Sequence, residues 1–262
     1  MRVGRILGIR LLCSSPSAMA DFYRHAFGCV EVACPLEEIS LRLGDEAISL
    51  RQAATPGRTD YAGNETGFQH LALVVSDMRL ALDRLSAVAG WAPISQAGPE
   101  ALPLASGGVT AFKFRDPEGH PLELLQFRPG AVPGHWQGMS RGAPFLGIDH
   151  SAISVTNTAR SAAHYAGLGF TVGRTQINRG IEQARLDGLE GAEVEVTPLT
   201  ADGPLHLELL RYRHPVAHSR PAVAGSTAAT ELILAMPGQE RPLPMLDPDG
   251  HRLRLSAVTS NG

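Results

Sequence analysis

The stretch that decides the fold is D-P-E-G-H-P-L-E-L at residues 116–124, together with D-P-D-G-H-R-L-R-L at residues 247–255. Each contains a turn rich in Asp, Pro and Gly that joins two runs of alternating or apolar residues. Such a turn between two β-type runs predicts a hairpin. Because the motif occurs once in each half of the sequence, the chain contains an internal repeat.

A second pair of segments supports a duplication. Residues 17–28 read S-A-M-A-D-F-Y-R-H-A-F-G, and residues 159–170 read A-R-S-A-A-H-Y-A-G-L-G-F. Both predict a short helix that follows a strand and is closed by a glycine, Gly28 or Gly167. The two helices lie further apart in the sequence than the two hairpin motifs do, so the second half has lost material. The equivalent aromatic residues of the two helices are Tyr23 and Tyr165.

A further repeat divides each half. F-Q-H-L-A-L-V-V-S-D at residues 68–77 resembles I-D-H-S-A-I-S-V-T-N at residues 148–157, and each predicts a strand that runs into a capped helix. In the last repeat the segment from Thr230 to Asp247 is too short for an average helix and its neighbouring strands. The sequence therefore predicts four βαβββ modules, the last degenerate, at residues 6–54, 67–128, 146–213 and 226–258.

The predicted fold class is α+β, with tandem βαβββ modules that form curved mixed sheets. Residues 129–145 are rich in Gly and Pro, which is typical of a linker. We expect an N-terminal domain at residues 1–128, with modules one and two, and a C-terminal domain at residues 146–262, with modules three and four.

Four side chains in modules two and three indicate chemistry. Strand alternation places His70 and His150 at the start of their strands, on the face opposite the helix. The last strands of the same modules, P-L-E-L-L-Q-F and L-H-L-E-L-L-R-Y, carry Glu123 and Glu208 within apolar runs. A charged Glu there is costly unless it is paired or bound to a metal. His206, two residues before Glu208, is a candidate supporting donor.

A His on the first strand and a Glu on the last strand of a βαβββ module, with a D-P-x-G-H-x-L-E-L turn, resemble the vicinal oxygen chelate superfamily of glyoxalases, bleomycin-resistance proteins and extradiol dioxygenases. The resemblance implies two glyoxalase-like domains and one divalent metal ion. It gives His70, Glu123, His150 and Glu208 as the metal ligands. Imidazole and carboxylate ligands suit Fe, Mn, Ni, Co or Zn.

The pairing of the modules decides whether this ligand set is complete. Module one offers Gly8 and Ser49 at the equivalent positions, and module four offers Thr230 or Glu231 with Arg254. Sequential pairing would leave each half with one His and one Glu. Crossed pairing of modules two and three gives the full set, so we favour crossing.

Three functions fit the resemblance. The leading hypothesis is a metal-dependent lyase, isomerase or epimerase that acts beside a carbonyl, with Glu123 or Glu208 as the catalytic base. The first alternative is an Fe(II) extradiol-type ring-cleaving dioxygenase, which would need a Glu where Arg254 stands. The second is a non-catalytic protein that sequesters a small molecule or antibiotic, in which each histidine is hydrogen-bonded to the glutamate of its own module.

Composition limits the partners. The 262-residue chain has a net charge of −3 and carries no block of like charge, so neither nucleic acid nor an anionic membrane is expected. No apolar run approaches the roughly 20 residues that span a bilayer. The three cysteines, Cys13, Cys29 and Cys34, are expected to be reduced thiols in a cytoplasmic protein. We expect a small-molecule substrate and a monomer or homodimer.

Overall fold

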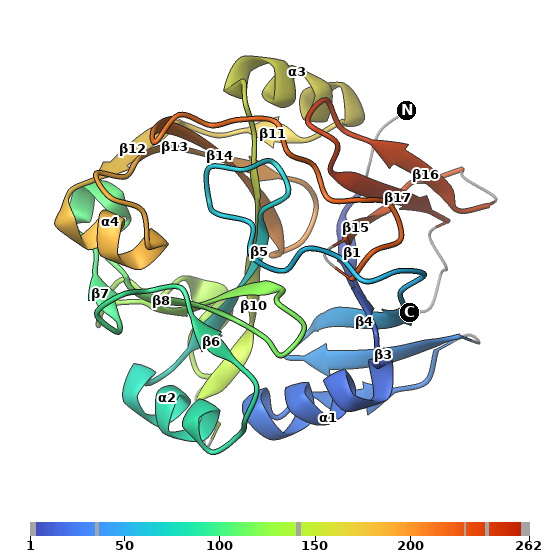
Figure 1. The fold of residues 1–262 in the computed structure, drawn as a ribbon, viewed down its shortest axis with the longest axis horizontal. Coiled ribbons are helices and arrows are strands. Elements are labelled where there is room, and N and C mark those ends of the chain that lie inside the picture. Colours follow the sequence, from blue (N-terminus) through green and yellow to red (C-terminus); the bar gives the residue numbers. More distant parts are fainter. Residues whose placement is uncertain (1–3, 35–36, 140–142, 228, 239–240, 258–262) are drawn as a thin grey trace.

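A computed structural model describes residues 4–34, 37–139, 143–227, 229–238 and 241–257 (Figure 1). Module one comprises β1 (Ile6–Cys13), α1 (Pro16–Phe27), β2 (Val30–Val32), β3 (Glu38–Leu43) and β4 (Glu46–Gln52). Module two comprises β5 (Gln69–Val75), α2 (Met78–Ser86), β6 (Ala92–Pro93), β7 (Glu100–Ala101), the 3-10 helix η1 (Leu104–Ser106), β8 (Thr110–Arg115) and β9 (Pro121–Gln126).

The second half of the chain begins after the 3-10 helix η2 (Gly134–Trp136). Module three comprises β10 (Phe145–Ser154), α3 (Thr158–Leu168), β11 (Thr171–Val172), β12 (Gln176–Arg179), α4 (Ile181–Asp187), β13 (Glu193–Thr200) and β14 (His206–His214). Module four comprises β15 (Thr230–Ala235), β16 (Leu243–Leu246) and β17 (Arg252–Ser256).

The structure contains two mixed sheets, and each joins one module from the first half of the chain to one module from the second half. One sheet has the order β16-β17-β15-β1-β4-β3-β2 and joins modules one and four. The other has the order β11-β13-β14-β10-β5-β9-β8-β6 and joins modules two and three. The joints are the antiparallel pairs β1 with β15 and β5 with β10. The crossed pairing favoured by the sequence is confirmed.

The fold class is confirmed as well, with four modules and curled mixed sheets. Each sheet takes strands from both halves of the sequence, which Figure 1 shows as blue beside red in one sheet and teal beside yellow-green in the other. The division into residues 1–128 and 146–262 remains a prediction. Within the expected linker, residues 129–145, Trp136 is packed inside the protein with 3% of its surface exposed.

Module four is degenerate, as expected. Among its described residues, 226–227, 229–238 and 241–257, the three strands β15, β16 and β17 are present and no helix occurs. The hairpin turns predicted from the two D-P-x-G-H motifs lie between β8 and β9 and between β16 and β17. In the described part of the chain, no helix is long and apolar enough to cross a membrane.

The helices begin at the caps that the sequence indicates. Ser15, Asp77 and Asn157 each accept a hydrogen bond from a backbone N–H of the first turn of α1, α2 and α3. Gly28 closes α1 in the left-handed conformation. The expectation that Gly167 closes α3 is wrong, because the helix runs to Leu168 and Gly169 takes the left-handed conformation instead.

Side-chain alternation separates the core from the site. On β5, Leu71, Leu73 and Val75 belong to the main hydrophobic core, into which α2 also packs. His70 lies on the opposite face of the same strand, together with Ala72. The apolar side chains thus hold the sheet against its helices and leave the other face of the sheet free for polar groups.

Two tyrosine hydroxyls tie the helices to the hairpins. Tyr23 on α1 donates to Asp116 Oδ2 at 3.1 Å, and Tyr165 on α3 donates to Asp247 Oδ2 at 3.1 Å. These bonds link modules one and two, and modules three and four, in sequence order. The sheets therefore join the modules crosswise while the tyrosines join them sequentially, which stabilises all four as one unit.

Candidate metal centre

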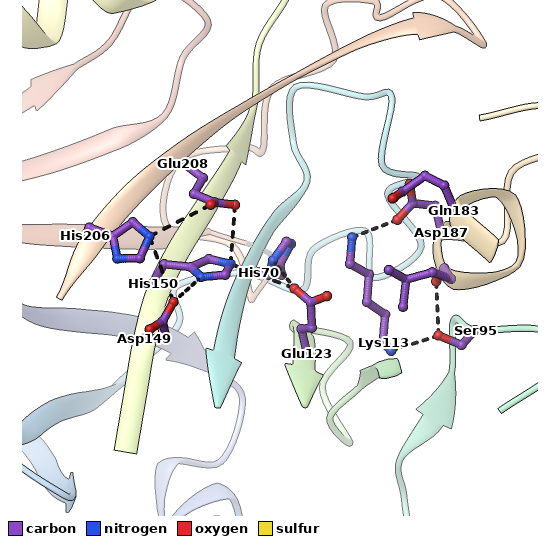
Figure 2. A network of polar contacts seen from close by, with 11 residues as sticks. His70, Ser95, Lys113, Glu123, Asp149, His150, Gln183, Asp187, His206 and Glu208 are labelled. Carbon is purple, nitrogen blue, oxygen red and sulfur yellow. Dashed lines mark hydrogen bonds and ion pairs between the residues drawn. The ribbon is translucent and has the colours of Figure 1, made fainter. Parts of the chain in front are cut away.

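Strand register brings the four predicted ligands onto one face. In the antiparallel pair β5 with β10, His70 lies opposite Ala152 and His150 lies opposite Ala72. In the flanking parallel pairs, Ala72 lies opposite Glu123 and Ala152 lies opposite Glu208. The two modules thus repeat one geometry, and the polar side chains meet at their junction (Figure 2).

Three of these four residues form a tight group. The Nε2 atom of His70 lies 2.9 Å from Glu123 Oε2, and the Nε2 atom of His150 lies 3.8 Å from the same oxygen. One potential ligand atom from each of the three lies within 4.8 Å of the others. All three side chains are buried.

Glu208 lies at the edge of this group. Its Oε2 atom is 3.6 Å from His150 Nε2, and its side chain is 20% exposed. Although both glutamates stand within apolar runs, Glu123 is buried and Glu208 is half-buried. Glu208 lies on β14, where His206 is half-buried as well. The Nε2 atom of His206 lies 3.8 Å from Glu208 Oε1.

Asp149 is a residue that the sequence did not single out. Its Oδ2 atom lies 2.9 Å from His150 Nδ1, and its Oδ1 atom accepts a hydrogen bond from the indole of Trp136 at 3.3 Å. A carboxylate on the far nitrogen fixes the ring and its tautomer, and leaves Nε2 as the free nitrogen. Asp149 directly precedes His150, so the sequence contained this signal.

The electrostatics of the group favour a cation at its centre. Burial alone would raise the pKa of Glu123 and of Glu208, but Lys113 beside Glu123 and His150 beside Glu208 outweigh it and lower both values to about 2. Burial alone would lower the pKa of His150, yet Glu208 and Asp149 raise it to about 9. The carboxylates remain charged and draw positive charge to the point between them.

The residues fit a divalent metal ion. Although His70 Nε2 and Glu123 Oε2 are close, they are not aligned for hydrogen bonding, and the Nε2 atoms of His70 and His150 have no hydrogen-bond partner. Buried nitrogens without partners are costly, and ligand atoms directed at one ion have this arrangement. The pair of imidazoles with a carboxylate suits a transition metal.

The group opens into a cavity of about 190 Å³. Its walls are partly apolar, with Leu125, Phe127, Val194, Val196 and Leu210. Across from the histidines it is lined by Lys113 and Gln183 (Figure 2). Neither residue was predicted from the sequence, although a lysine between two phenylalanines in A-F-K-F-R was a usable signal.

The equivalent position in the other sheet is filled by ion pairs between side chains of the protein. The guanidinium of Arg10 lies 2.7 Å from Glu231 Oε2, and Arg254 Nε lies 3.2 Å from the same oxygen. On β15, Glu231 lies two residues before the residue that pairs with Arg254 across the sheet, and each histidine has the same spacing from the residue opposite its glutamate. Glu231, rather than Thr230, is therefore the counterpart of the histidines. Arginines fill the place where a metal would lie, so this position is blank, as expected.

A pair of joined βαβββ modules with imidazole and carboxylate side chains in the cavity between them defines the class of glyoxalase-fold proteins. Residues 5–124 match the model of the Glyoxalase/Bleomycin resistance protein/Dioxygenase superfamily. The resemblance drawn from the sequence is thereby confirmed for this segment of the chain.

Solved structures extend the fold over nearly the whole chain. Glyoxalase I from Zea mays is 16% identical, with a TM-score of 0.63, and the match covers 97% of this chain and 92% of that one. A Bacillus subtilis protein described as a "putative dioxygenase" is 12% identical, with a TM-score of 0.58, and the match covers 99% and 87%. No curated protein matches the sequence. At these identities the structural matches establish the fold.

Proposed function

We propose that this protein is a metal-dependent enzyme that moves a proton beside a carbonyl group of a small molecule, as a lyase, isomerase or epimerase does. The observation that carries the proposal is the pair of buried Nε2 atoms, on His70 and His150, that share Glu123 and lack hydrogen-bond partners. Those three residues would hold the ion, and Glu208 is near enough to join them. A bound divalent cation supplies Lewis acidity, which polarises a carbonyl oxygen and stabilises negative charge on it.

The two glutamates would have different roles. Glu123 is buried and lies against His70, which suits a permanent ligand. Glu208 is half-buried, borders the cavity and lies at the edge of the group, so its carboxylate has room to move. We assign Glu208 as the base that takes the proton from the carbon beside the carbonyl and returns it to the substrate. His206, beside Glu208, would orient that carboxylate.

A second function is favoured by one observation. The tight group consists of two histidines and one carboxylate, His70, His150 and Glu123, which is the ligand pattern of non-haem Fe(II) oxygenases. A ring-cleaving dioxygenase is therefore the alternative, now with the crossed pair of modules as its site. Under this alternative Glu208 would be dispensable for holding the ion.

Isotope exchange under anaerobic conditions distinguishes these functions. Protein loaded with Zn, Ni, Co, Mn or Fe is incubated in deuterated water with α-hydroxycarbonyl compounds, and deuterium at the carbon beside the carbonyl is measured. We expect exchange that Glu208→Gln abolishes without loss of metal, whereas Asp83→Asn on the exposed face of α2 leaves it unchanged. Oxygen uptake with a catechol and no exchange would favour the dioxygenase, and neither activity would favour a sequestering protein.

A further inference from the structure

Lys113 is the only lysine in the 262-residue sequence, whose other cationic side chains are arginines and histidines. It lies on β8, opposite Glu123 on β9, and only 4% of its surface is exposed. Its neighbours Phe112 and Phe114 belong to the hydrophobic core, so alternation turns Lys113 to the cavity face. A buried lysine needs a specific partner.

Asp187, the last residue of α4, supplies that partner. Its Oδ1 atom lies 2.7 Å from Lys113 Nζ, and its Oδ2 atom accepts a hydrogen bond from Gln183 Nε2 at 2.7 Å. Figure 2 shows Lys113 extending from beside Glu123 toward Asp187 and Gln183. The ammonium is thus neutralised by a buried carboxylate. It retains protons that can donate to a further group, since an ammonium has three.

The bond to Asp187 also fixes the orientation of Gln183. A carboxylate only accepts, so the amide nitrogen must face Asp187 and the amide oxygen must face away from it. That oxygen, Oε1, is buried and has no hydrogen-bond partner, and the same is true of Asn178 Oδ1 on β12. Both residues line the cavity and are at least nine-tenths buried. Unsatisfied buried acceptors are costly, which favours a ligand with hydrogen-bond donors.

The charge around the cavity is unfavourable for an anionic ligand. Three carboxylates border the cavity, those of Glu123, Asp149 and Glu208, against one ammonium, and that ammonium is already paired. Among the described residues, no arginine borders the cavity. Because Asp187 neutralises the ammonium, the three carboxylates would keep a net negative charge even with a divalent ion bound. The volume of about 190 Å³ also falls below the roughly 300 Å³ or more of pockets that enclose drug-sized ligands.

We propose that Lys113, Gln183 and Asn178 form a substrate-recognition site across the cavity from the candidate metal ligands. It selects a small, uncharged substrate whose far end offers N–H or O–H donors beside an oxygen acceptor, as a carboxamide does. The acceptors Gln183 and Asn178 bind the donors, and Lys113 donates to the oxygen. For the end of the substrate that lies at the metal ligands, this inference rests on the proposed function. For the opposite end, it rests on the unpartnered acceptors of Gln183 and Asn178.

Because Lys113 is unique, protein grown with 15N-labelled lysine carries one side-chain ammonium signal that reports on this site. The probes are monohydroxamates of four- to six-carbon dicarboxylic acids whose far end is either a primary amide or a carboxylate. We expect the amide to move the Lys113 signal of zinc-loaded protein at about tenfold lower concentration than the matched carboxylate. Gln183→Met and Asn178→Leu should each remove this preference.

Acetohydroxamate, which lacks the far end, is the control. It should bind the wild type and both variants alike if the substitutions leave the metal ligands intact. Preference for the carboxylate, equal response to both probes, or no response to either would overturn the proposal. Zinc content is measured separately, so a protein that binds no zinc but still prefers the amide would refute the proposed function and retain this site.

Discussion

His150 Nε2 lies 3.8 Å from Glu123 Oε2, although His150 belongs to module three and Glu123 to module two. Neither half of the chain contains this pair. Its formation depends on the antiparallel joint between β5 and β10, which sets two strands from different halves side by side. The candidate site is therefore a property of the whole chain.

Loss of either histidine should abolish tight metal binding. His70→Ala and His150→Ala each remove one of the two Nε2 atoms that lack other partners, and we expect metal affinity to fall by at least about 100-fold. Arg254→Ala, at the equivalent place in the other sheet, is the matched control and should leave affinity nearly unchanged. Competition with a coloured chelator measures all three. Similar losses in the control and in the histidine variants would indicate general unfolding.

Asp149→Asn should weaken metal binding without removing a ligand. The carboxylate of Asp149 holds the far nitrogen of His150, and an amide in its place no longer fixes the ring tautomer. We expect a loss of about 10- to 100-fold in affinity and an unchanged number of ions bound at saturation. Calorimetric titration gives both quantities. An affinity equal to that of the wild type would show that His150 is oriented by other contacts.

Neither half should keep the site when it is expressed alone. Residues 1–130 would lose β10 and β15, and would expose the edges of β5 and β1, whose residues are almost all buried. We expect poor folding, with weak or no metal binding, because exposed apolar edge strands associate with other chains. Circular dichroism and chelator competition test this expectation. A well-folded half with full affinity would mean that the modules can also pair sequentially.

Glu231 should stabilise the fold in a pH-dependent manner. Burial raises its pKa, but Arg10 and Arg254 outweigh burial and lower it below the ordinary value of 4.5. A lowered pKa in the folded state means that the stabilisation is present above the ordinary value and is lost as the pH falls through the folded value. Glu231→Gln should therefore cost about 2 kcal/mol at pH 7 and less at an acidic pH below 4.5, measured by urea unfolding. An equal cost at both pH values would contradict this electrostatic account.

Periodicity and repeats in the sequence were sufficient to predict the modules and their pairing. The blank positions Gly8 and Arg254 carried that inference, since only modules two and three had both ligand types. Lys113, Asn178 and Gln183 were missed because they are not part of the repeat. They come together through α4 and β12, elements specific to module three, and through the ion pair of Lys113 with Asp187. Contacts of this kind depend on tertiary packing, which the alternation of residues along a strand does not contain.

The number of metal ions per chain tests the central claim most directly. Protein purified without a histidine tag is stripped with a chelator, reloaded separately with Fe(II), Mn(II), Ni(II), Co(II) and Zn(II), and analysed by elemental mass spectrometry. Among the described residues, two groups of potential metal ligands occur in the joined modules two and three: His70 with Glu123 and His150, and Asp149 with His150 and His206. Because both groups need His150, they provide for one ion, while the ion pairs of Glu231 fill the equivalent position in the other sheet. We expect close to one tightly bound equivalent of at least one of these metals. Two tight equivalents, or none under any loading, would contradict the account.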